Sequence, residues 1–398
     1  SQMLSSRQLF LLNTAQTSSF PRAIEIERSE GMYLYAPDGK RYMDLVSGFA
    51  VSNTGHRHPK VVKAIKDQVD KYLHLTVYGE YIQSPQVKFA EKLASILPET
   101  LHSIYFVNSG TEATEGAMKL AKRFTGRSNI IACHNSYHGS TQGALSIMGD
   151  EYWRNAFRPL LPGTLQLNYN SFEDLQHITT QTACVVAESI QAEAGVLKPQ
   201  NGWLLALRNR CTQTGTLLVL DEIQCGFGRN GTLWAFEQFG VVPDVLLLGK
   251  ALGGGMPLGA FVADKKLMDT LSHHPVLGHI NTFGGHPVCC AAGLAAIGVL
   301  LKENLMACIP EKEKLFISLL VHPHIKAVRS AGLMLAVEFD SFETNKKIID
   351  TLIENGVFTD WFLFCAHAFR ICPPLNISDE EISNACSIII QVLNGNIT

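Results

Sequence analysis

The sequence predicts an α/β fold with a large, mainly parallel sheet and a smaller α+β domain. Short apolar runs of three to five residues recur through the first two thirds of the chain, and each ends in polar or small residues. Such runs are typical of parallel strands that are buried on both faces. After residue 287 the pattern changes to alanine- and leucine-rich helices with a few strands, which indicates a second layered unit.

Length and composition exclude several classes of protein. A chain of 398 residues is too long for one ordinary core, and 46% hydrophobic with 17% charged residues is typical of a soluble, globular, enzyme-like protein rather than a disordered one. The net charge of -3 gives no electrostatic reason to expect nucleic acid or membrane as a partner. We find no secretory signal or membrane-spanning apolar run. The ten cysteines include no C-x-x-C pair, so we expect reduced thiols and a cytoplasmic location.

The order of patterns predicts three parts. Residues 1–45 form an N-terminal arm and a hairpin around Pro37-Asp38-Gly39, which we expect to pack with the small domain. Residues 46–286 form the large domain, and residues 287–398 form the C-terminal small domain. His56 and His58 could suggest a metal site, but no third ligand follows at a familiar spacing, so a loop with hydrogen-bonded histidines is favoured.

A strand at 103–107 runs through Ser109-Gly110-Thr111 into an amphipathic helix at 112–124. Free N–H groups at a helix N-terminus, together with the helix dipole, hold anions well. An N-cap without any ligand explains the same residues equally well.

Four more predicted strands end in polar residues. The strands at 130–132, 183–187, 216–220 and 245–248 are each followed by candidate site residues. The carboxyl ends of parallel strands meet at one edge of a sheet, where ligands bind in open α/β folds. This edge therefore collects the following side chains: Tyr137, His138, Glu188, Glu193, Asp221, Gln224 and Lys250.

Lys250 is the residue around which these candidates are organised. It stands at the end of a buried apolar run and directly before a glycine-rich turn. A partly desolvated lysine has a lowered pKa, so its neutral amine can attack a carbonyl and form a Schiff base. A lysine that simply extends into solvent is the alternative.

Two nucleotide-binding hypotheses fail. The strand that ends at Asp221-Glu222 looks like a magnesium-binding strand of a nucleotide hydrolase, but no G-x-x-x-x-G-K-[ST] accompanies it, and no G-x-G-x-x-G follows a strand. A pyridoxal cofactor instead needs a lysine imine, a carboxylate under the ring nitrogen, a stacking group and a phosphate site. Each need has a candidate at the predicted edge.

Several ordered motifs then identify a family. The chain resembles the class III aminotransferases, within them the acetylornithine and ornithine aminotransferase group, from residue 31 to the last helix. The motifs that carry the resemblance are NSGTEATEGAMKLAKR at 108–123, YHGS at 137–140, ESIQAEAGV at 188–196, LDEIQCGFGR at 220–229, LLGKALGGGMPLGA at 247–260, NTFGGHP at 281–287 and FRICPPL at 369–375.

The resemblance implies a fold-type I homodimer that binds pyridoxal 5'-phosphate, with active sites at the subunit interface. It implies that Lys250 is the Schiff-base residue and proton shuttle and that Asp221 pairs with the pyridine nitrogen. The other implied cofactor contacts are the phosphate site Ser109, Gly110 and Thr111, with Thr282 reaching the partner's cofactor, and Tyr137, His138, Gln224 and Glu188 around the ring.

The resemblance also implies a substrate side. Arg370 would bind the α-carboxylate, and Glu193 would pair with Arg370 and swing aside for the dicarboxylate acceptor; a structural salt bridge is the alternative. Asn281 and Phe49 complete the implied substrate contacts.

Two departures from the family pattern concern the substrate. Ser140 stands where related enzymes carry an arginine for the distal carboxylate, which Arg57, Arg154 or Arg158 would have to replace. Phe49 stands where ornithine enzymes carry a tyrosine, and a phenyl ring cannot hydrogen-bond a free α-amino group. The aromatic segment at 360–364 is expected to reshape the pocket or to thicken the core of the small domain.

We therefore expect an aminotransferase that moves the terminal amino group of N-acetylornithine or a similar ω-amino donor to 2-oxoglutarate by a ping-pong route. Alternatives are ornithine, lysine, a β-amino acid or 4-aminobutyrate as donor, and an aminomutase or decarboxylase reaction on the same scaffold. A cofactor-free binding relative is disfavoured because Lys250 is present. No metal is expected.

Overall fold

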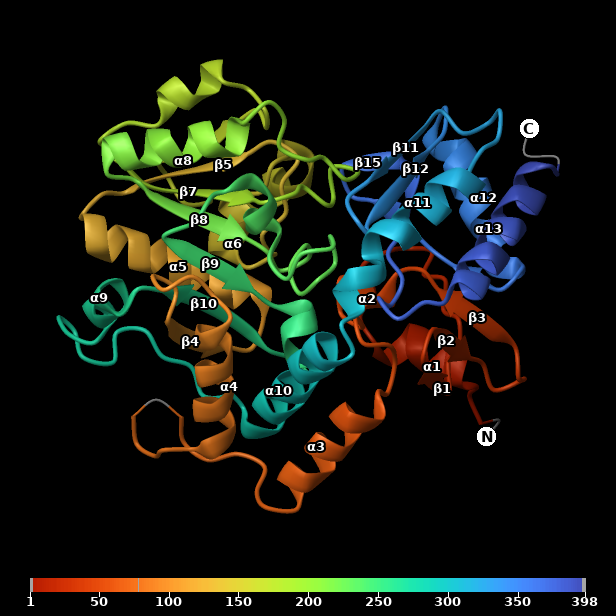
Figure 1. The fold of residues 1–398 in the computed structure, drawn as a ribbon, viewed down its shortest axis with the longest axis horizontal. Coiled ribbons are helices and arrows are strands. Elements are labelled where there is room, and N and C mark those ends of the chain that lie inside the picture. Colours follow the sequence, from red (N-terminus) through yellow and green to blue (C-terminus); the bar gives the residue numbers. More distant parts are fainter. Residues whose placement is uncertain (1–2, 78, 396–398) are drawn as a thin grey trace.

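A central seven-stranded sheet dominates the computed structural model, which describes residues 3–77 and 79–395 (Figure 1). The predicted arm and small domain thus begin and end with a few residues outside the described ranges. Across the sheet the order is β4 (Ser103–Val107), β10 (Gly259–Ala263), β9 (Val245–Leu248), β8 (Leu217–Asp221), β7 (Thr182–Glu188), β5 (Asn129–Cys133) and β6 (Thr164–Leu167). Only β10 runs antiparallel to its neighbours. The predicted mainly parallel sheet is confirmed.

The strands of this sheet are buried on both faces because their side chains are apolar on both sides. All residues of β7, β8, β9 and β10 are buried. Helix α5 (Gly110–Thr125) lies on one face and packs against β10, β9 and β7. It begins two residues earlier than predicted because Ser109 is its N-cap and accepts a hydrogen bond from the Glu112 amide.

The structure has two smaller sheets, and one of them joins the two ends of the chain. One has the order β1 (Arg28–Glu30), β2 (Tyr33–Tyr35), β3 (Arg41–Asp44) and β13 (Val357–Phe358), so the N-terminal hairpin pairs with a C-terminal strand. Figure 1 shows the hairpin in red beside the blue C-terminal elements. The other has the order β11 (Ala327–Ser330), β12 (Leu335–Glu338), β15 (Cys365–Ile371) and β14 (Trp361–Phe362).

The remaining helices cover these sheets. Helix α10 (Pro287–Lys302) packs against α3 (Pro59–Val69), α4 (Ser84–Ser95) and the 3₁₀ turn η4 (Lys250–Gly253). These three partners belong to the predicted large domain, whereas α10 itself was assigned to the small domain. The predicted division at residue 286 stays a prediction, and this packing favours a division after α10. The other helices are α1 (Ser6–Asn13), α2 (Ser47–Ala50), α3 (Pro59–Val69), α4 (Ser84–Ser95), α6 (Gln142–Ser146), α7 (Glu151–Arg154), α8 (Trp203–Thr214), α9 (Lys265–Met268), α10 (Pro287–Lys302), α11 (Ile309–Leu319), α12 (Phe342–Glu354) and α13 (Asp379–Leu393), with short 3₁₀ turns η1 (Asn155–Phe157), η2 (Glu173–His177), η3 (Ala235–Phe239), η5 (Asp269–Leu271) and η6 (Leu305–Cys308).

Two further expectations concern the whole chain. All ten cysteines are free thiols, and every one except Cys308 is buried. Within the described ranges no single helix has the length and apolar character to cross a bilayer. Helix α10 and the segment at 305–319 are long and apolar enough only when taken together, and this pair is bent by 55°.

Candidate active site

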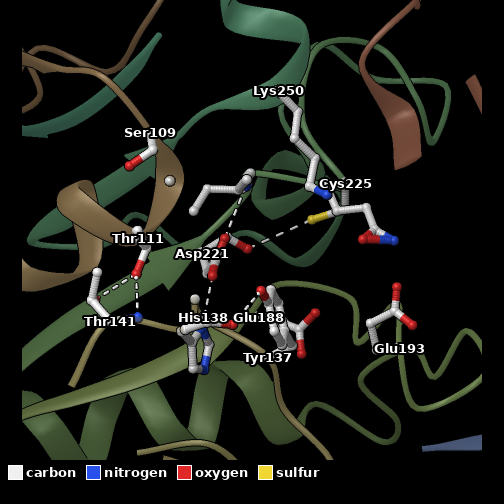
Figure 2. Close-up of a pocket in the computed structure, with 15 residues that line it drawn as sticks. Ser109, Thr111, Tyr137, His138, Thr141, Glu188, Glu193, Asp221, Cys225 and Lys250 are labelled. Atoms are coloured by element: carbon white, nitrogen blue, oxygen red, sulfur yellow. Dashed lines mark hydrogen bonds and ion pairs between the residues drawn. The ribbon is translucent and has the colours of Figure 1, made fainter. Parts of the chain in front are cut away.

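A cavity of about 520 Å³ lies at the carboxyl edge of the central sheet. It is lined from the ends of β4, β5, β7, β8 and β9, as the topology predicts. Figure 2 shows Ser109, Thr111 and Thr141 at one side of the cavity, Glu193 at the other, and Asp221 between them. The lining residues are Ser109, Gly110, Thr111, Tyr137, His138, Gly139, Ser140, Thr141, Glu188, Glu193, Asp221, Ile223, Gln224, Cys225 and Lys250.

The start of α5 forms the end of the cavity that suits an anion. The first-turn amides of a helix have no intrahelical partner, and the hydroxyl of Thr111 lies 2.6 Å from that of Thr141. Gly139 has a φ of +129°, and a Cβ there would come within 2.1 Å of Thr111 Oγ1. The chain can therefore pass this close to the helix start only with glycine at position 139.

Asp221 is fixed in place at the floor of the cavity. Its Oδ1 accepts a hydrogen bond from the Ile223 amide at 2.9 Å, and its Oδ2 lies 2.7 Å from Nδ1 of His138. The other ring nitrogen of His138, Nε2, is buried and makes no hydrogen bond among the described residues. The pair aims a buried acid into the cavity from β8.

Lys250 is half-buried at the opposite wall. Desolvation is the main reason why the pKa of its amine lies below the ordinary value for lysine. Its backbone has a φ of +47°, a left-handed conformation that costs a non-glycine residue energy. The amine nitrogen lies 5.7 Å from the centre of the Phe49 ring. This placement favours the buried, reactive lysine over the solvated alternative.

Glu188, at the end of β7, is a second buried acid beside Asp221. Burial, with the nearby Asp221 charge second, raises the pKa of Glu188 well above its ordinary value. Its Oε1 accepts a hydrogen bond from the Ala192 amide at 3.2 Å, whereas its Oε2 has no partner in the described part of the chain. Burial thus favours the neutral form of Glu188.

Glu193 and Arg370 form a buried ion pair at the other end of the cavity. Nη2 of Arg370 lies 3.0 Å from both carboxylate oxygens of Glu193. Burial raises the pKa of Glu193, but the Arg370 charge and its hydrogen bonds outweigh burial, so the net pKa is lowered. The guanidinium lies between two rings, 4.8 Å from that of Phe49 and 4.5 Å from that of Phe362.

Several candidates lie outside the cavity lining of this single chain. Asn281 Oδ1 accepts a hydrogen bond from the Gly284 amide, and the carbonyl of Thr282 faces His74. Arg154 and Arg158 both pair with Glu151, so neither is placed to replace the arginine that Ser140 lacks. Ser140 itself lies 3.0 Å from the hydroxyl of Tyr137.

The two loop histidines for which no metal was expected are hydrogen-bonded, as predicted. His56 Nε2 lies 2.8 Å from Asp44, and His58 caps α3 by accepting a hydrogen bond from the Lys60 amide.

Sequence reasoning missed some residues of the site. Ile223 lines the cavity and packs so close to Gly110 that a Cβ there would lie 2.8 Å from Ile223 Cδ1. Thr141 follows the YHGS motif directly, and its hydroxyl donates to Glu115. The aromatic segment at 360–364 was not missed: it was expected to reshape the pocket or to thicken the core of the small domain, and it supplies the Phe362 ring beside Arg370 and the amide of Leu363, which donates to Glu193.

Comparison with known proteins then decides the family. The model of the family described as aminotransferase class-III matches residues 14–393. The chain belongs to the class III aminotransferases. It is 37% identical over 381 residues to the acetylornithine aminotransferase of Methanopyrus kandleri, covering 95% of this chain and 96% of that one. It is 39% identical over 375 residues to that of Methanosarcina mazei, covering 92% and 91%.

Solved structures of this class share the fold. The ornithine aminotransferase of Toxoplasma gondii, with PLP partly occupying its active site, matches with a TM-score of 0.89 at 29% identity, covering 96% of this chain and 92% of that one. The acetylornithine aminotransferase of Elizabethkingia anophelis matches with a TM-score of 0.84 at 30% identity, covering 96% and 97%. The protein therefore has the fold-type I architecture of the class.

Class III aminotransferases use pyridoxal phosphate, and the cavity fits this group. The buried Lys250 amine can take its aldehyde, and the helix start at Gly110 offers an anion site. The Asp221–His138 pair supplies a buried acid, and Oε2 of Glu188, which has no hydrogen-bond partner among the residues described, supplies a further polar atom in the lining.

Proposed function

We propose that this aminotransferase moves the terminal amino group of N-acetylornithine, or of a similarly acylated ω-amino donor, to 2-oxoglutarate in two alternating half-reactions. One observation carries this proposal. Arg370, a buried cation close to Lys250, is held by a carboxylate from another loop rather than by main-chain groups alone. A carboxylate on a substrate can take the place of Glu193 on this cation.

The pair suits two substrates of different charge. A terminal-amine donor has no carboxylate next to its reacting carbon, so Glu193 stays on Arg370 while the donor reacts. An α-oxo acid has one, and Glu193 must leave Arg370 to it. Phe49 lies near both Lys250 and Arg370, which supports a carboxylate site beside the reacting carbon.

Pyridoxal phosphate supplies an electron-accepting ring when bound. We propose that Lys250 binds its aldehyde and moves the substrate proton, because its amine lies in the cavity and desolvation lowers its pKa. Asp221 would hold the ring nitrogen, with His138 keeping the carboxylate in place. The phosphate would lie on Ser109, Gly110 and Thr111; Tyr137, Glu188 and Gln224 would orient the ring from the remaining walls.

Phe49 favours an acylated donor. Its ring packs over the Arg370 guanidinium and offers no hydrogen-bond acceptor, so a free α-ammonium group placed there would lose its water without a partner. The curated relatives named above are acetylornithine aminotransferases, which supports the same choice.

We further propose a homodimer in the cytoplasm. The segment at 276–283, which contains Asn281 and Thr282, exposes large apolar side chains although it belongs to a well-packed protein. A second copy would cover them and would bring Thr282 to the partner's cofactor phosphate and Asn281 to the substrate side. The ten free thiols support a reducing compartment.

A half-reaction screen tests the proposal. The yellow enzyme is mixed with N-acetylornithine, ornithine, lysine or 4-aminobutyrate, and the loss of the visible absorbance of the cofactor is followed before 2-oxoglutarate is added. We expect N-acetylornithine to react with a kcat/KM about tenfold or more above that for ornithine, and 2-oxoglutarate to restore the absorbance. A faster reaction with another donor would mean that N-acetylornithine is not the preferred donor. Carbon dioxide release or isomerisation without an oxo acid would refute transamination.

A further inference from the structure

Glu193 lies on a short loop that leaves the end of β7 and turns back sharply. The main chains of Gln191 and Leu197 pair with each other through two hydrogen bonds of 2.9 Å. Between them Gly195 and Val196 have φ values of +89° and +62°. The loop is therefore a tight hairpin with Glu193 near its tip, and its position depends on what holds the tip.

Arg329, on β11 of the small sheet, holds this tip. Its Nε donates a hydrogen bond of 2.7 Å to the carbonyl of Gly195, two residues after Glu193. Its Nη1 pairs with Glu338, and its Nη2 lies 3.5 Å from the sulfur of Cys365. The guanidinium thus reaches from the small sheet to the main chain of a large-sheet loop, and the ion pair with Glu338 fixes its direction.

The contact is close enough to depend on glycine. A Cβ at position 195 would lie 2.8 Å from the sulfur of Cys365 and 2.9 Å from Nη2 of Arg329. Together with the positive φ, this means that the loop tip can approach Arg329 only because residue 195 has no side chain.

Arg329 also explains a cluster that resembles a metal site. The ligand atoms of Glu338, Cys365 and His367 lie within 4.8 Å of one another. The guanidinium of Arg329 already contacts Glu338 and Cys365, so the carboxylate of the cluster has a cationic partner within the protein itself.

We propose that Arg329 is a positioning residue for Glu193: it anchors the main chain of the loop, so that Glu193 leaves and recovers Arg370 by rotation of its side chain alone. The inference rests on the proposed function, in which Glu193 and a substrate carboxylate alternate on Arg370. The anchor provided by Arg329 explains how Glu193 returns to the same position after each acceptor has reacted.

The remaining tethers of Glu193 show why such an anchor is needed. Its carboxylate is held by Arg370 and by the amide of Leu363, and its carbonyl by the amide of Phe364. The Arg370 contact is lost whenever a substrate takes Arg370. The loop then keeps its main-chain pairing at the base, the Ala192 contact to Glu188 and the Phe364 and Arg329 contacts, and among these Arg329 acts at the tip of the turn.

The test compares the two half-reactions of holoenzyme carrying Arg329→Gln. With the tip released, Glu193 covers Arg370 less often, so we expect kcat/KM for the amino donor to fall about three- to tenfold, the effect of one hydrogen bond, while kcat/KM for 2-oxoglutarate stays equal or rises. A role in stability alone would lower both equally. Equal changes, or none, would overturn the inference. Arg329→Lys keeps the pair with Glu338, and we expect a shift in the same sense should the glutamine variant not fold.

A binding measurement makes the test independent of turnover. Glutarate, a dicarboxylate without a reacting carbonyl, is titrated into each holoenzyme while the cofactor absorbance is recorded. We expect it to bind about three- to tenfold more tightly to Arg329→Gln than to the original protein, because Glu193 competes less for Arg370. Unchanged or weaker glutarate binding would count against the anchor.

Lys326→Gln is the matched control. Lys326 lies just before β11 and pairs with Asp340 in an exposed ion pair, so the same charge is lost nearby without contact to Gly195, and neither the half-reaction ratio nor glutarate binding should change. A shift equal to that of Arg329→Gln would assign the effect to charge and overturn the anchor. If the original protein does not react with N-acetylornithine but the glutarate difference persists, the proposed donor is wrong and the inference stands.

Discussion

Two buried arginines of this protein have opposite kinds of partner. Arg229 is fully buried and donates to the carbonyls of Leu333 and Pro373 and to the side-chain oxygen of Asn53, at 2.5 to 2.8 Å. Arg370 is almost as buried, but it is held chiefly by the carboxylate of Glu193 and two aromatic rings.

The difference separates a charge that builds the fold from a charge that serves a substrate. The carbonyls around Arg229 belong to the main chain and cannot leave, and its guanidinium joins three segments far apart in the sequence. Burial lowers the pKa of Arg229, and the hydrogen bonds to these oxygens offset the cost of burying its charge. Arg370 donates to one main-chain carbonyl, that of Trp361, but its charged partner is a side chain on a loop, which can rotate away. A buried arginine whose charged partner can be exchanged therefore indicates the substrate site, and one whose partners cannot leave indicates a structural role in the core.

The largest expected effect comes from Lys250, a buried cavity charge without any hydrogen bond among the described residues. We expect Lys250→Ala to lower kcat by about 10⁴-fold or more, because both the attachment point and the proton carrier are lost. Its melting temperature should stay equal or rise, since an amine buried without a hydrogen-bond partner is removed. Steady-state kinetics of cofactor-loaded protein and thermal unfolding of cofactor-free protein measure the two effects. Normal turnover would refute the proposed mechanism.

The second largest effect is expected when the buried charge of Arg229 in the core is removed. Arg229→Met leaves the carbonyls of Leu333 and Pro373 without their donor, so we expect the free energy of unfolding to fall by about 3 kcal/mol or more. Arg370→Met is the matched variant: its partner Glu193 lines the cavity, where water can solvate it, so less than about half of that loss is expected.

Urea unfolding of both variants, with acceptor kinetics, measures the contrast. Arg370→Met should lose the reaction with 2-oxoglutarate while it remains folded. Equal destabilisation of the two variants would remove the distinction between structural and exchangeable partners.

The sequence predicted the sheet edge well because local rules govern it. The apolar runs before Glu188, Asp221 and Lys250 proved to be strands that end within two residues of these side chains. A short apolar run that ends in a polar residue is typical of a strand buried in a parallel sheet, with the polar residue at the carboxyl edge. The Glu193–Arg370 contact came from the family resemblance, and the structure places the two side chains together.

Contacts between distant segments were beyond such rules. Nothing in the sequence around Arg329 indicates that its Nε donates to the carbonyl of Gly195. The contact depends on how the sheet that contains β11 packs against the loop that carries Glu193. The same holds for Ile223, which follows Asp221 and lines the cavity only because Gly110 lets it approach. The packing of α10 on α3 likewise arises from the tertiary structure, whereas composition placed a division before it.

The smallest expected effect concerns Glu222, the acidic counterpart of Arg229 in the core. It lies beside Asp221 but points away from the cavity, and its carboxylate accepts hydrogen bonds from the Ser189 hydroxyl and the amides of Ala235 and Phe236. Burial raises the pKa of Glu222 from its ordinary value of 4.5 to about 7, and these hydrogen bonds only partly oppose the rise.

A raised pKa in the folded state means that folding favours the protonated acid. Between pH 4.5 and about 7 the unfolded chain has lost this proton and the folded protein still holds it. The contribution of Glu222 to stability is therefore complete below pH 4.5, falls as the pH rises through this window, and is lost above about pH 7; the whole change is about 3 kcal/mol.

Glu222→Gln removes this pH dependence because an amide does not titrate. We expect the difference in unfolding free energy between the original protein and the variant, measured by urea unfolding from about pH 5 to about pH 8, to shrink as the pH rises. Glu99→Gln, at an exposed turn, should show no such slope. A constant difference over the whole range would mean that the three donors keep Glu222 ionised throughout, as a carboxylate held permanently by its neighbours in the core, like the guanidinium of Arg229.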